Sequence, residues 1–287
     1  MQNIMLATDF SERSDRALRR ATLLAKEAGA RLMLVHVVDN DRPRRIVDHD
    51  RKDAERLLRE LASTVQGVDG VTCDARTILA DPCAGIVEAV ADAAPDLLVI
   101  GPHRQQILMD AFAGTTAERT IRSVACPVLM VNGAPVGPYR HVLQTTDLSE
   151  GSHAALLRFA RLKIGNHAGH SLLYVFDAPA LRLAMAHSMP NDGREDYLQD
   201  ERTTALRSLS EFMASIGTER AEQIVRHDET TTANEILKVA VELKADLIVV
   251  STRGKVGLAR MVLGSVTEQV LRTSPVDVLA VPPERTQ

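Results

Sequence analysis

Short aliphatic runs alternate along the chain with longer stretches in which apolar residues recur at helical spacing. Residues 4–7 and 32–38 are aliphatic runs, and between them Ala17, Leu24 and other apolar residues lie three or four positions apart up to Gly29. The runs are typical of buried strands, and the spacing between them is that of a helix packed on one face. Strict alternation of strand and helix predicts parallel strands joined by helical crossovers.

The same alternation continues to the end of the chain. Asp81 followed by Pro82 indicates a helix start, because an acidic N-cap accepts from free amides and Pro fits the first helical turn. Further helices are expected around residues 50–65 and over 117–124. The remaining strands are expected at residues 71–78, 97–100, 127–131, 141–145, 171–176, 222–226, 247–250 and 276–281.

The order of elements occurs twice because the sequence itself repeats. Residues 3–12 match residues 141–150, and residues 95–101 match residues 245–251. A period this long indicates a duplicated domain, since solenoid repeats are far shorter. The predicted fold is α/β, with two repeated domains, each an open, five-stranded, mostly parallel sheet with helices on both faces. The first domain is expected over residues 1–133, a Gly/Pro linker over 134–139 and the second domain over 140–287.

The spacing between the repeats widens within the second copy. Asp9 and Asp147 are 138 residues apart, whereas Gly114 and Gly264 are 150 apart, which places a net insertion of twelve residues at about 178–199. The insertion follows the second strand of that copy, on the side of the sheet where open α/β folds bind ligands. Its apolar residues suit three roles: a lid over the crevice, a patch for a protein partner, or packing against the first domain.

Composition and charge mainly exclude classes of function. Aromatic residues make up 3% of the chain, Trp is absent and the formal net charge is −4. A nucleic-acid surface normally needs a basic excess or stacking aromatics, so no nucleic-acid partner is expected. No apolar run reaches the ~18 residues of a membrane span and the start has no signal-peptide pattern, which favours a cytoplasmic protein without a membrane partner.

Several other reactive or charged residues have plain structural interpretations. The three cysteines, Cys73, Cys83 and Cys126, have no metal-type spacing and are expected to be buried thiols. His36 lies within an aliphatic strand and is expected to be half-buried with its hydrogen bonds satisfied. The basic run at residues 42–45 is expected to be a solvated loop.

Two motifs shared by both halves identify a family. Residues 8–12 and 146–150 read Thr-Asp-(Phe/Leu)-Ser-Glu after the first strand, and a glycine loop follows the Asp-Leu-(Leu/Ile)-Val strand of each half. On these residues each half resembles a universal stress protein domain, and residues 3–281 resemble a tandem member of that family. The resemblance implies a Rossmann-like fold of the adenine-nucleotide alpha hydrolase type and a role in the stress response.

The glycine loops relate the chain to the nucleotide-binding members of the family. Those members carry a Gly, two residues, a second Gly, nine residues, and a third Gly followed by Ser or Thr. Residues 251–254 read Ser-Thr-Arg-Gly, with Gly-Ser at 264–265; residues 101–104 read Gly-Pro-His-Arg, with Gly-Thr at 114–115. Each half keeps the spacing and has lost one glycine.

The resemblance assigns a nucleotide site to each half. Phosphates bind where backbone amides converge at a helix start, and glycine lets the backbone approach them closely. The implied second-half residues are Thr146 and Asp147 at the ribose, the Val175 backbone at adenine, Ser251, Arg253 and Gly254 along the phosphate path, and Gly264, Ser265, Val266 and Thr267 at the phosphates. The corresponding first-half residues are Asp9, Val37, Gly101, His103, Gly114 and Thr115.

The second half is expected to be the better site. Ser251 adds only a small side chain that can donate a hydrogen bond, whereas Arg104 places a long side chain where the backbone should approach phosphate. Arg104 would either fill the first-half pocket or pair its guanidinium with a phosphate. The implied ligand is ATP or another adenine nucleotide such as AMP, with Mg²⁺ accompanying ATP.

Two other classes of function stay open. The last strands of the two halves, at 127–131 and 276–281, are short edges that would pair within the chain and make a nucleotide-free pseudo-dimer that binds protein partners. A homodimer of the whole chain is a further arrangement of the same class. A slow ATPase is least favoured, because no motif supplies a catalytic base and the P-loop pattern is missing.

Overall fold

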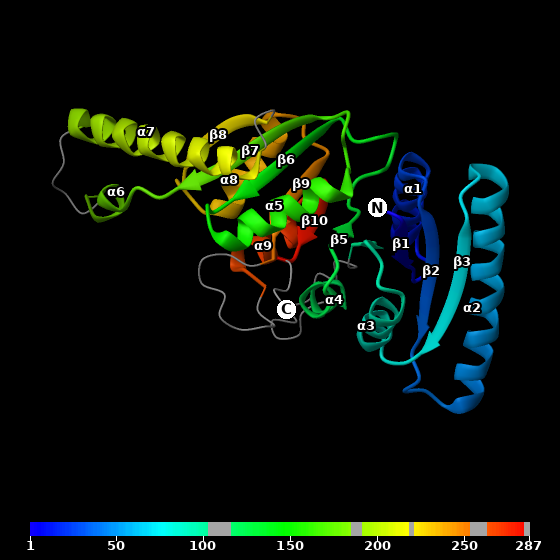
Figure 1. Cartoon of the computed structure of the whole chain (residues 1–287). Helices are drawn as coiled ribbons and strands as arrows, with labels where there is room; N and C mark the ends of the chain where they lie inside the picture. The colour runs from blue at the N-terminus through cyan, green and yellow to red at the C-terminus, as the bar shows by residue number, and fades with distance from the viewer. Residues whose placement is uncertain (103–115, 185–190, 218–220, 253–262, 284–287) are drawn as a thin grey trace.

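The computed structural model of the chain describes residues 1–102, 116–184, 191–217, 221–252 and 263–283 (Figure 1). The first half contains the strands β1 (Asn3–Ala7), β2 (Arg31–Val38), β3 (Cys73–Leu79), β4 (Leu97–Ile100) and β5 (Val128–Met130). Its helices are α1 (Glu12–Ala28), α2 (Arg44–Thr64) with a π-helical end η1 (Val65–Asp69), α3 (Pro82–Ala93) and α4 (Thr116–Ser123).

The second half repeats this order. Its strands are β6 (His141–Thr146), β7 (Gly169–Phe176), β8 (Glu222–His227), β9 (Leu247–Ser251) and β10 (Asp277–Val281). Its helices are α5 (Glu150–Leu162), α6 (Pro179–Ala184), α7 (Asn191–Ile216), α8 (Thr232–Glu242) and α9 (Ser265–Thr273). The predicted α/β class with helices on both faces of a mostly parallel sheet is confirmed.

The described strands form one ten-stranded sheet in the order β3-β2-β1-β4-β5-β10-β9-β6-β7-β8. Within each half every strand pair is parallel, whereas β5 and β10 pair antiparallel, with Val128 opposite Ala280 and Met130 opposite Val278. The sheet therefore runs without a break from one half into the other, and Figure 1 shows the halves side by side about this junction.

Local sequence signals explain where the first helix of each half begins. Ser11 caps α1 by accepting a hydrogen bond from the Ser14 amide, and Ser149 caps α5 in the same way. Gly29 ends α1 in the left-handed conformation, with φ of 62°, which glycine adopts without a steric penalty. The aliphatic faces of these helices then pack on a sheet whose central strands are almost fully buried.

The second helix of the first half begins earlier than the sequence predicted. We expected a helix from about residue 50 and a solvated loop over 42–45, but α2 starts at Arg44 with Pro43 as its N-cap. The side chain of Val47 is buried against Val38 and Ala54. This apolar contact extends the helix by a further turn and a half, so Arg44 and Arg45 belong to its exposed first turn.

The insertion in the second half lies at one end of the molecule. The described part of it forms α6 and the first turns of α7, a helix of 26 residues that corresponds to the 21-residue α2 of the first half. Figure 1 shows α6 and the start of α7 at the end of the molecule farthest from the first half. Packing of the insertion against the first half, one of the three predicted roles, is therefore wrong for these residues.

Charged residues join α4 to α9 across the junction in a nearly symmetric pattern. Glu118 accepts hydrogen bonds of 2.6 and 3.1 Å from Arg272, and Glu268 accepts one of 2.9 Å from Arg122. The two acids, like the two bases, are 150 residues apart and occupy matching positions in the repeats. Each helix gives the other one acid and one base, as two subunits do across a two-fold axis.

A buried cluster ties the linker to both halves. The Arg20 guanidinium of α1 lies 3.1 Å from one carboxylate oxygen of Asp277 in β10, and the Tyr139 hydroxyl donates to the same oxygen at 2.7 Å. The other oxygen accepts from the backbone amides of Asn132 and Gly133, each at 3.0 Å. Groups from the first half and from both ends of the linker thus meet on a single second-half carboxylate.

Candidate functional site

The strand order reverses once in each half. In the first half the chain passes from β1 outward to β2 and β3 and then returns to β4 on the other side of β1; in the second half β6 and β9 have the same relation. In open α/β sheets the ligand crevice lies at such a reversal, beyond the carboxyl ends of the strands. The two candidate sites are therefore the carboxyl ends of β1 and β4 and the carboxyl ends of β6 and β9. These are called the first-half mouth and the second-half mouth.

A strained turn places an aspartate at each mouth. Phe10 and Leu148 follow these aspartates with φ of 59° and 62°, left-handed values that are costly for residues other than glycine. The Asp9 carboxylate accepts from the Ser11 amide at 3.0 Å, and the Asp147 carboxylate accepts from the Ser149 amide at the same distance. Both carboxylates are thus held in one orientation.

The charge of Asp9 is stabilised by its surroundings. Burial raises the pKa of this carboxyl, but hydrogen bonds from the Ser11 and Ser14 hydroxyls, the Ser11 amide and the charge of Arg13 outweigh burial and hold the pKa below its usual value. Each hydroxyl lies 2.5 Å from the same carboxylate oxygen. The turn is therefore built around an ionised aspartate.

The mouth of the second half opens one residue earlier than that of the first. The β1–β4 pairing extends to Ala7 opposite Ile100, whereas the β6–β9 pairing ends at Gln144 opposite Val249. The Thr145 hydroxyl instead donates to the Val249 carbonyl oxygen at 2.9 Å. The pairing of the two central strands therefore stops one residue sooner in the second half than in the first.

The start of α9 borders the second-half mouth. Gly264 is the N-cap, with φ of −61° and ψ of 140°, and no side chain caps the helix there. The amides of Ser265, Val266 and Thr267 have no partner within the helix, because the first turn of any α-helix leaves its N–H groups unpaired internally. The Thr267 hydroxyl donates to the Ser251 carbonyl oxygen at 2.7 Å and so ties the helix start to the end of β9.

The three predicted site residues in the first turn of α9 differ in exposure. Ser265 is exposed and Val266 is half-buried, while Thr267 is buried. Ser251 does not take a positive φ, so the loss of the first motif glycine imposes no backbone strain at this position. Thr146 is buried, and its hydroxyl accepts from the Leu148 amide at 2.9 Å, which makes Thr146 a support of the aspartate turn.

The second strand of each half carries one of the predicted adenine-contacting valines. Val37 and Val175 are both half-buried near the carboxyl ends of β2 and β7. His36 is half-buried as predicted, its Nδ1 lies 2.7 Å from the Thr8 carbonyl oxygen, and its ring centroid lies 4.4 Å from that of Phe10. Burial lowers the pKa of His36, against the opposing effects of this hydrogen bond and of nearby carboxylates.

Gly101 has a packing role that the motif did not reveal. A Cβ at this position would lie 3.1 Å from the carbonyl carbon and oxygen of Arg13, tighter than ordinary van der Waals contact. Arg13 itself donates from Nε to the Pro102 carbonyl oxygen at 3.1 Å. Sequence reasoning missed Arg13, although its alignment with Gly151 of the second half was a visible signal.

Some predicted site residues lie outside the described residues. These are His103, Gly114 and Thr115 of the first half and Arg253 and Gly254 of the second half. Arg104, the residue expected to fill or to complete the first-half pocket, lies in the same segment. Their roles stay predictions.

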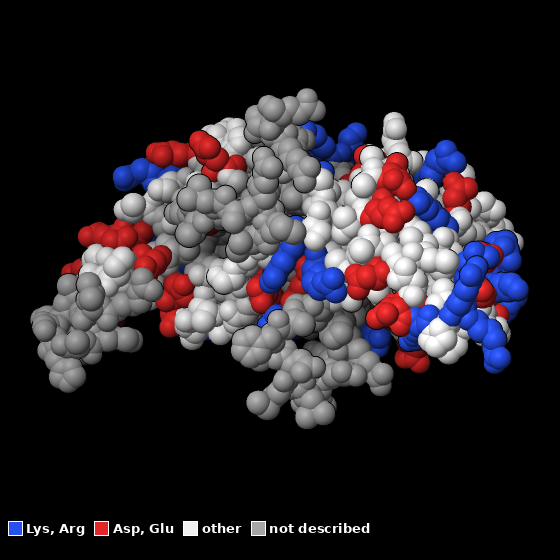
Figure 2. Space-filling model, turned by 90° about the horizontal axis from the view of Figure 1, so that it is seen from below, with Lys and Arg blue, Asp and Glu red and all other residues white. Residues whose placement is uncertain are grey.

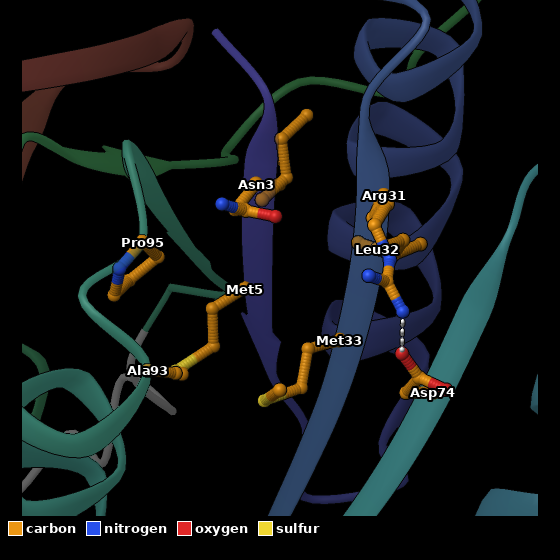
Figure 3. Close-up of a pocket in the computed structure, with 9 residues that line it drawn as sticks. Asn3, Met5, Arg31, Leu32, Met33, Asp74, Ala93 and Pro95 are labelled. Atoms are coloured by element: carbon orange, nitrogen blue, oxygen red, sulfur yellow. Dashed lines mark hydrogen bonds and ion pairs between the residues drawn. The ribbon is translucent and has the colours of Figure 1, made fainter.

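A separate hollow of about 220 Å³ lies at the opposite edge of the first-half sheet (Figure 3). It is lined at the amino ends of the strands, and Arg31 and Asp74 form an ion pair of 3.2 Å at its side. In the second half the positions of Asn3 and Met33, which line this hollow, hold His141 and Ser171, and the His141 Nε2 lies 3.0 Å from the Ser171 hydroxyl. Because the hollow is at the amino edge, it has no part in either mouth.

The cysteines are buried, as predicted. Burial raises the pKa of Cys73 to about 12 and that of Cys126 to about 11. Both thiols are therefore protonated at neutral pH and unreactive as nucleophiles.

Surface charge is mixed over the face seen in Figure 2, with basic side chains gathered at the end where α2 lies. Along α2 these bases are paired with acids, for example Arg51 with Glu55 and Arg56 with Glu60. Among the described residues no three His, Cys, Asp or Glu side chains form a cluster suited to a metal ion, and no helix is long and apolar enough to cross a bilayer.

Comparison with known proteins agrees with this architecture. The universal stress protein family matches the chain twice, over residues 1–132 and 138–282. A universal stress protein of Methanocaldococcus jannaschii is 37% identical over 86 residues, which is 30% of this chain and about half (49%) of that relative. Universal stress protein E of Salmonella typhi is 23% identical over 308 residues, covering 100% of this chain and 96% of the relative.

The fold also matches a solved tandem-length structure. The crystal structure of a universal stress protein from Archaeoglobus fulgidus superposes with a TM-score of 0.70 at 22% identity and covers 98% of both chains. The two family matches span most of the sequence, one in each half of the sheet. The chain therefore belongs to the universal stress protein family, as a tandem member with two copies of the family domain.

Proposed function

We propose that this chain binds an adenine nucleotide, ATP or AMP, in its second half and acts in a cytoplasmic stress response through the conformation and partners that the bound state favours. The observation that carries the proposal is the arrangement at the second-half mouth. There the fixed carboxylate of Asp147 and the uncapped start of α9 border one crevice between neighbouring strands.

The residues at this mouth suit the three parts of a nucleotide. The first-turn amides of α9 and the positive end of its dipole suit phosphate oxygens, and Ser265 adds an exposed hydroxyl. A carboxylate such as Asp147 suits the hydroxyls of a ribose. The half-buried Val175 offers an apolar surface and a strand backbone to a flat base. Arg253 and Gly254 complete the proposed phosphate path.

The first half is proposed as the weaker site. Its strand pairing extends one residue further toward the mouth, and Gly101 is needed for packing against Arg13. The first motif glycine is thus kept for a structural reason, which is independent of phosphate.

Replacement of Gly264 tests the second-half site. Among the described atoms, a Cβ at Gly264 would meet only the Thr267 hydroxyl, at 3.8 Å, and the φ of −61° suits any residue, so we expect Gly264→Val to fold. Valine would nevertheless keep phosphate from the backbone. Calorimetric titration of ATP into the full chain should show tight binding to the wild type and loss of that tight binding in Gly264→Val, with Ser265→Ala intermediate. Equal binding by wild type and Gly264→Val would overturn the assignment.

A second candidate function is a built-in pair that serves as an interaction module. The free edges of β5 and β10 pair with each other within one chain, and the α4–α9 ion pairs lie across the same junction. A second copy of the chain cannot pair through those edges. Light scattering after size exclusion should give the mass of a single chain at micromolar concentration; a stable dimer would show that another surface associates.

A further inference from the structure

Arg13 spans the mouth of the first-half crevice. Its Nε donates to the Pro102 carbonyl oxygen, just after β4, at 3.1 Å, and its guanidinium lies 3.5 Å from the Asp9 carboxylate, just after β1. β1 and β4 are the two strands between which the strand order reverses. One side chain therefore ties together the two segments between which a ligand would enter.

The second half cannot form this connection. The residue that corresponds to Arg13 is Gly151, which has no side chain. The position next to the Arg13 backbone has also changed. It is Gly101 in the first half, where an added Cβ would lie 3.1 Å from the Arg13 carbonyl group, and Ser251 in the second half. Each half therefore has one glycine in this pair of positions, Gly101 in the first half and Gly151 in the second.

The connection is weak enough to open. The side chains of Arg13 and Asp9 are 33% and 62% exposed, and ion pairs with this exposure add little to stability because water solvates both charges in the open state. The hydrogen bond to Pro102 is part of the same solvated edge. The connection can therefore regulate access without being essential to the fold.

We infer that Arg13 is a strap that restricts nucleotide access to the first-half crevice, and that Gly151 leaves the second half without one. The inference rests on the proposed function, since the ligand is the same adenine nucleotide. It identifies one residue pair, Arg13 and Gly151, as the determinant of which half binds more tightly.

The test measures ATP with Mg²⁺ in calorimetric titrations of the full chain. Arg13→Ala is placed in the Gly264→Val background, so that only the first half can bind, and Arg16→Ala on the exposed side of α1 is the matched control. We expect Arg13→Ala to tighten first-half binding up to about fivefold, the change that follows from releasing a solvent-exposed ion pair. Gly151→Arg alone should weaken second-half binding by a similar factor, with Gly151→Ala as its control.

The outcomes separate the strap from the proposed function. If Gly264→Val removes the tight binding but Arg13→Ala does not strengthen the binding that remains, the strap is wrong and the second-half site stands. If Arg13→Ala binds more weakly than its parent, the guanidinium contacts the ligand and the strap is also wrong. If the wild type does not bind but Arg13→Ala does, the strap stands and the second-half assignment falls. Absence of binding in every variant overturns both.

Discussion

The two halves share one fold but meet their common junction unequally. The α4–α9 contact is symmetric, with matching acids and bases on both sides. The first residue of β10, Asp277, accepts from Arg20 and Tyr139, whereas the matching first-half position is Pro127. Arg158, which corresponds to Arg20, donates to the carbonyl oxygens of Ala125 and Pro282.

This difference shows what fusion of two copies changes. A symmetric contact gives each half the same role and can arise from two identical domains. The buried carboxylate also accepts from the backbone amides of Asn132 and Gly133, directly before the linker that joins the halves. The asymmetric cluster therefore belongs to the tandem protein, and we expect it to dominate the stability of the junction.

Removal of the Asp277 charge should have the largest effect. Asp277→Asn leaves Arg20 buried without its counter-charge, and loss of one partner of a buried ion pair typically costs about 3–5 kcal/mol. Urea unfolding should show this loss for Asp277→Asn and at most about 1 kcal/mol for Arg31→Gln, whose ion pair with Asp74 is exposed. Similar losses for both variants would contradict a dominant cluster.

The two α4–α9 ion pairs should contribute unequally to stability, because their carboxylates are buried to different extents. The Glu118 carboxylate is 5% exposed and that of Glu268 is 29% exposed, although they occupy matching positions. Glu118→Gln should cost about 1–3 kcal/mol, the range for a hydrogen bond to a charged group, and Glu268→Gln about half as much or less. Chemical denaturation of the two single variants measures the difference, and equal costs would show that burial does not distinguish them.

The glycine loops should differ in their tolerance of a side chain. Gly101→Ser, which copies Ser251, places a Cβ 3.1 Å from the Arg13 carbonyl group and should cost about 1–2 kcal/mol through local overpacking. Ser251→Gly, the reverse change, should stay within about 1 kcal/mol, since Ser251 takes no positive φ. Thermal unfolding of both variants measures the contrast, which would vanish if the α1 backbone can shift.

The smallest expected effect is a pH dependence specific to the first half. The pKa of His36 is lowered by burial, so the unfolded chain binds the proton more readily than the folded chain. Its contribution to stability is therefore complete above the unfolded value of about 6.5 and is lost as pH falls through that value toward the folded pKa. His36→Asn keeps a donor for the Thr8 carbonyl and should lose less stability between about pH 7.5 and about pH 5.5 than the wild type.

An exposed histidine provides the control for that measurement. His49→Asn removes a side chain that is 75% exposed on α2 and controls for the loss of one histidine from the chain. In the second half Tyr174 occupies the position of His36, so no histidine stands at the matching place. An unchanged pH profile in His36→Asn would show that protonation of His36 does not affect folding.

Local patterns in the sequence were enough for most of the fold. Strand β4 lies where the aliphatic run predicted it, and α3 begins at Pro82 after the Asp81 cap. The start of α2 was missed because Val47 acts through burial against Val38, a contact that periodicity over residues 50–65 does not include. The aspartate turns could be located, but the earlier end of strand pairing in the second half could not, since it depends on contacts between strands that are distant in the sequence.

The sequence by itself determined the duplication, the family and the positions of the site motifs. These depend on neighbouring residues and on fixed spacings, which a linear chain records directly. Only the tertiary structure decided that Arg20 meets Asp277, 257 residues away, and that Arg13 meets Pro102, 89 residues away. Such contacts depend on how helices and strands pack, because side-chain partners are selected by burial and distance in the folded state and leave no regular spacing in the sequence.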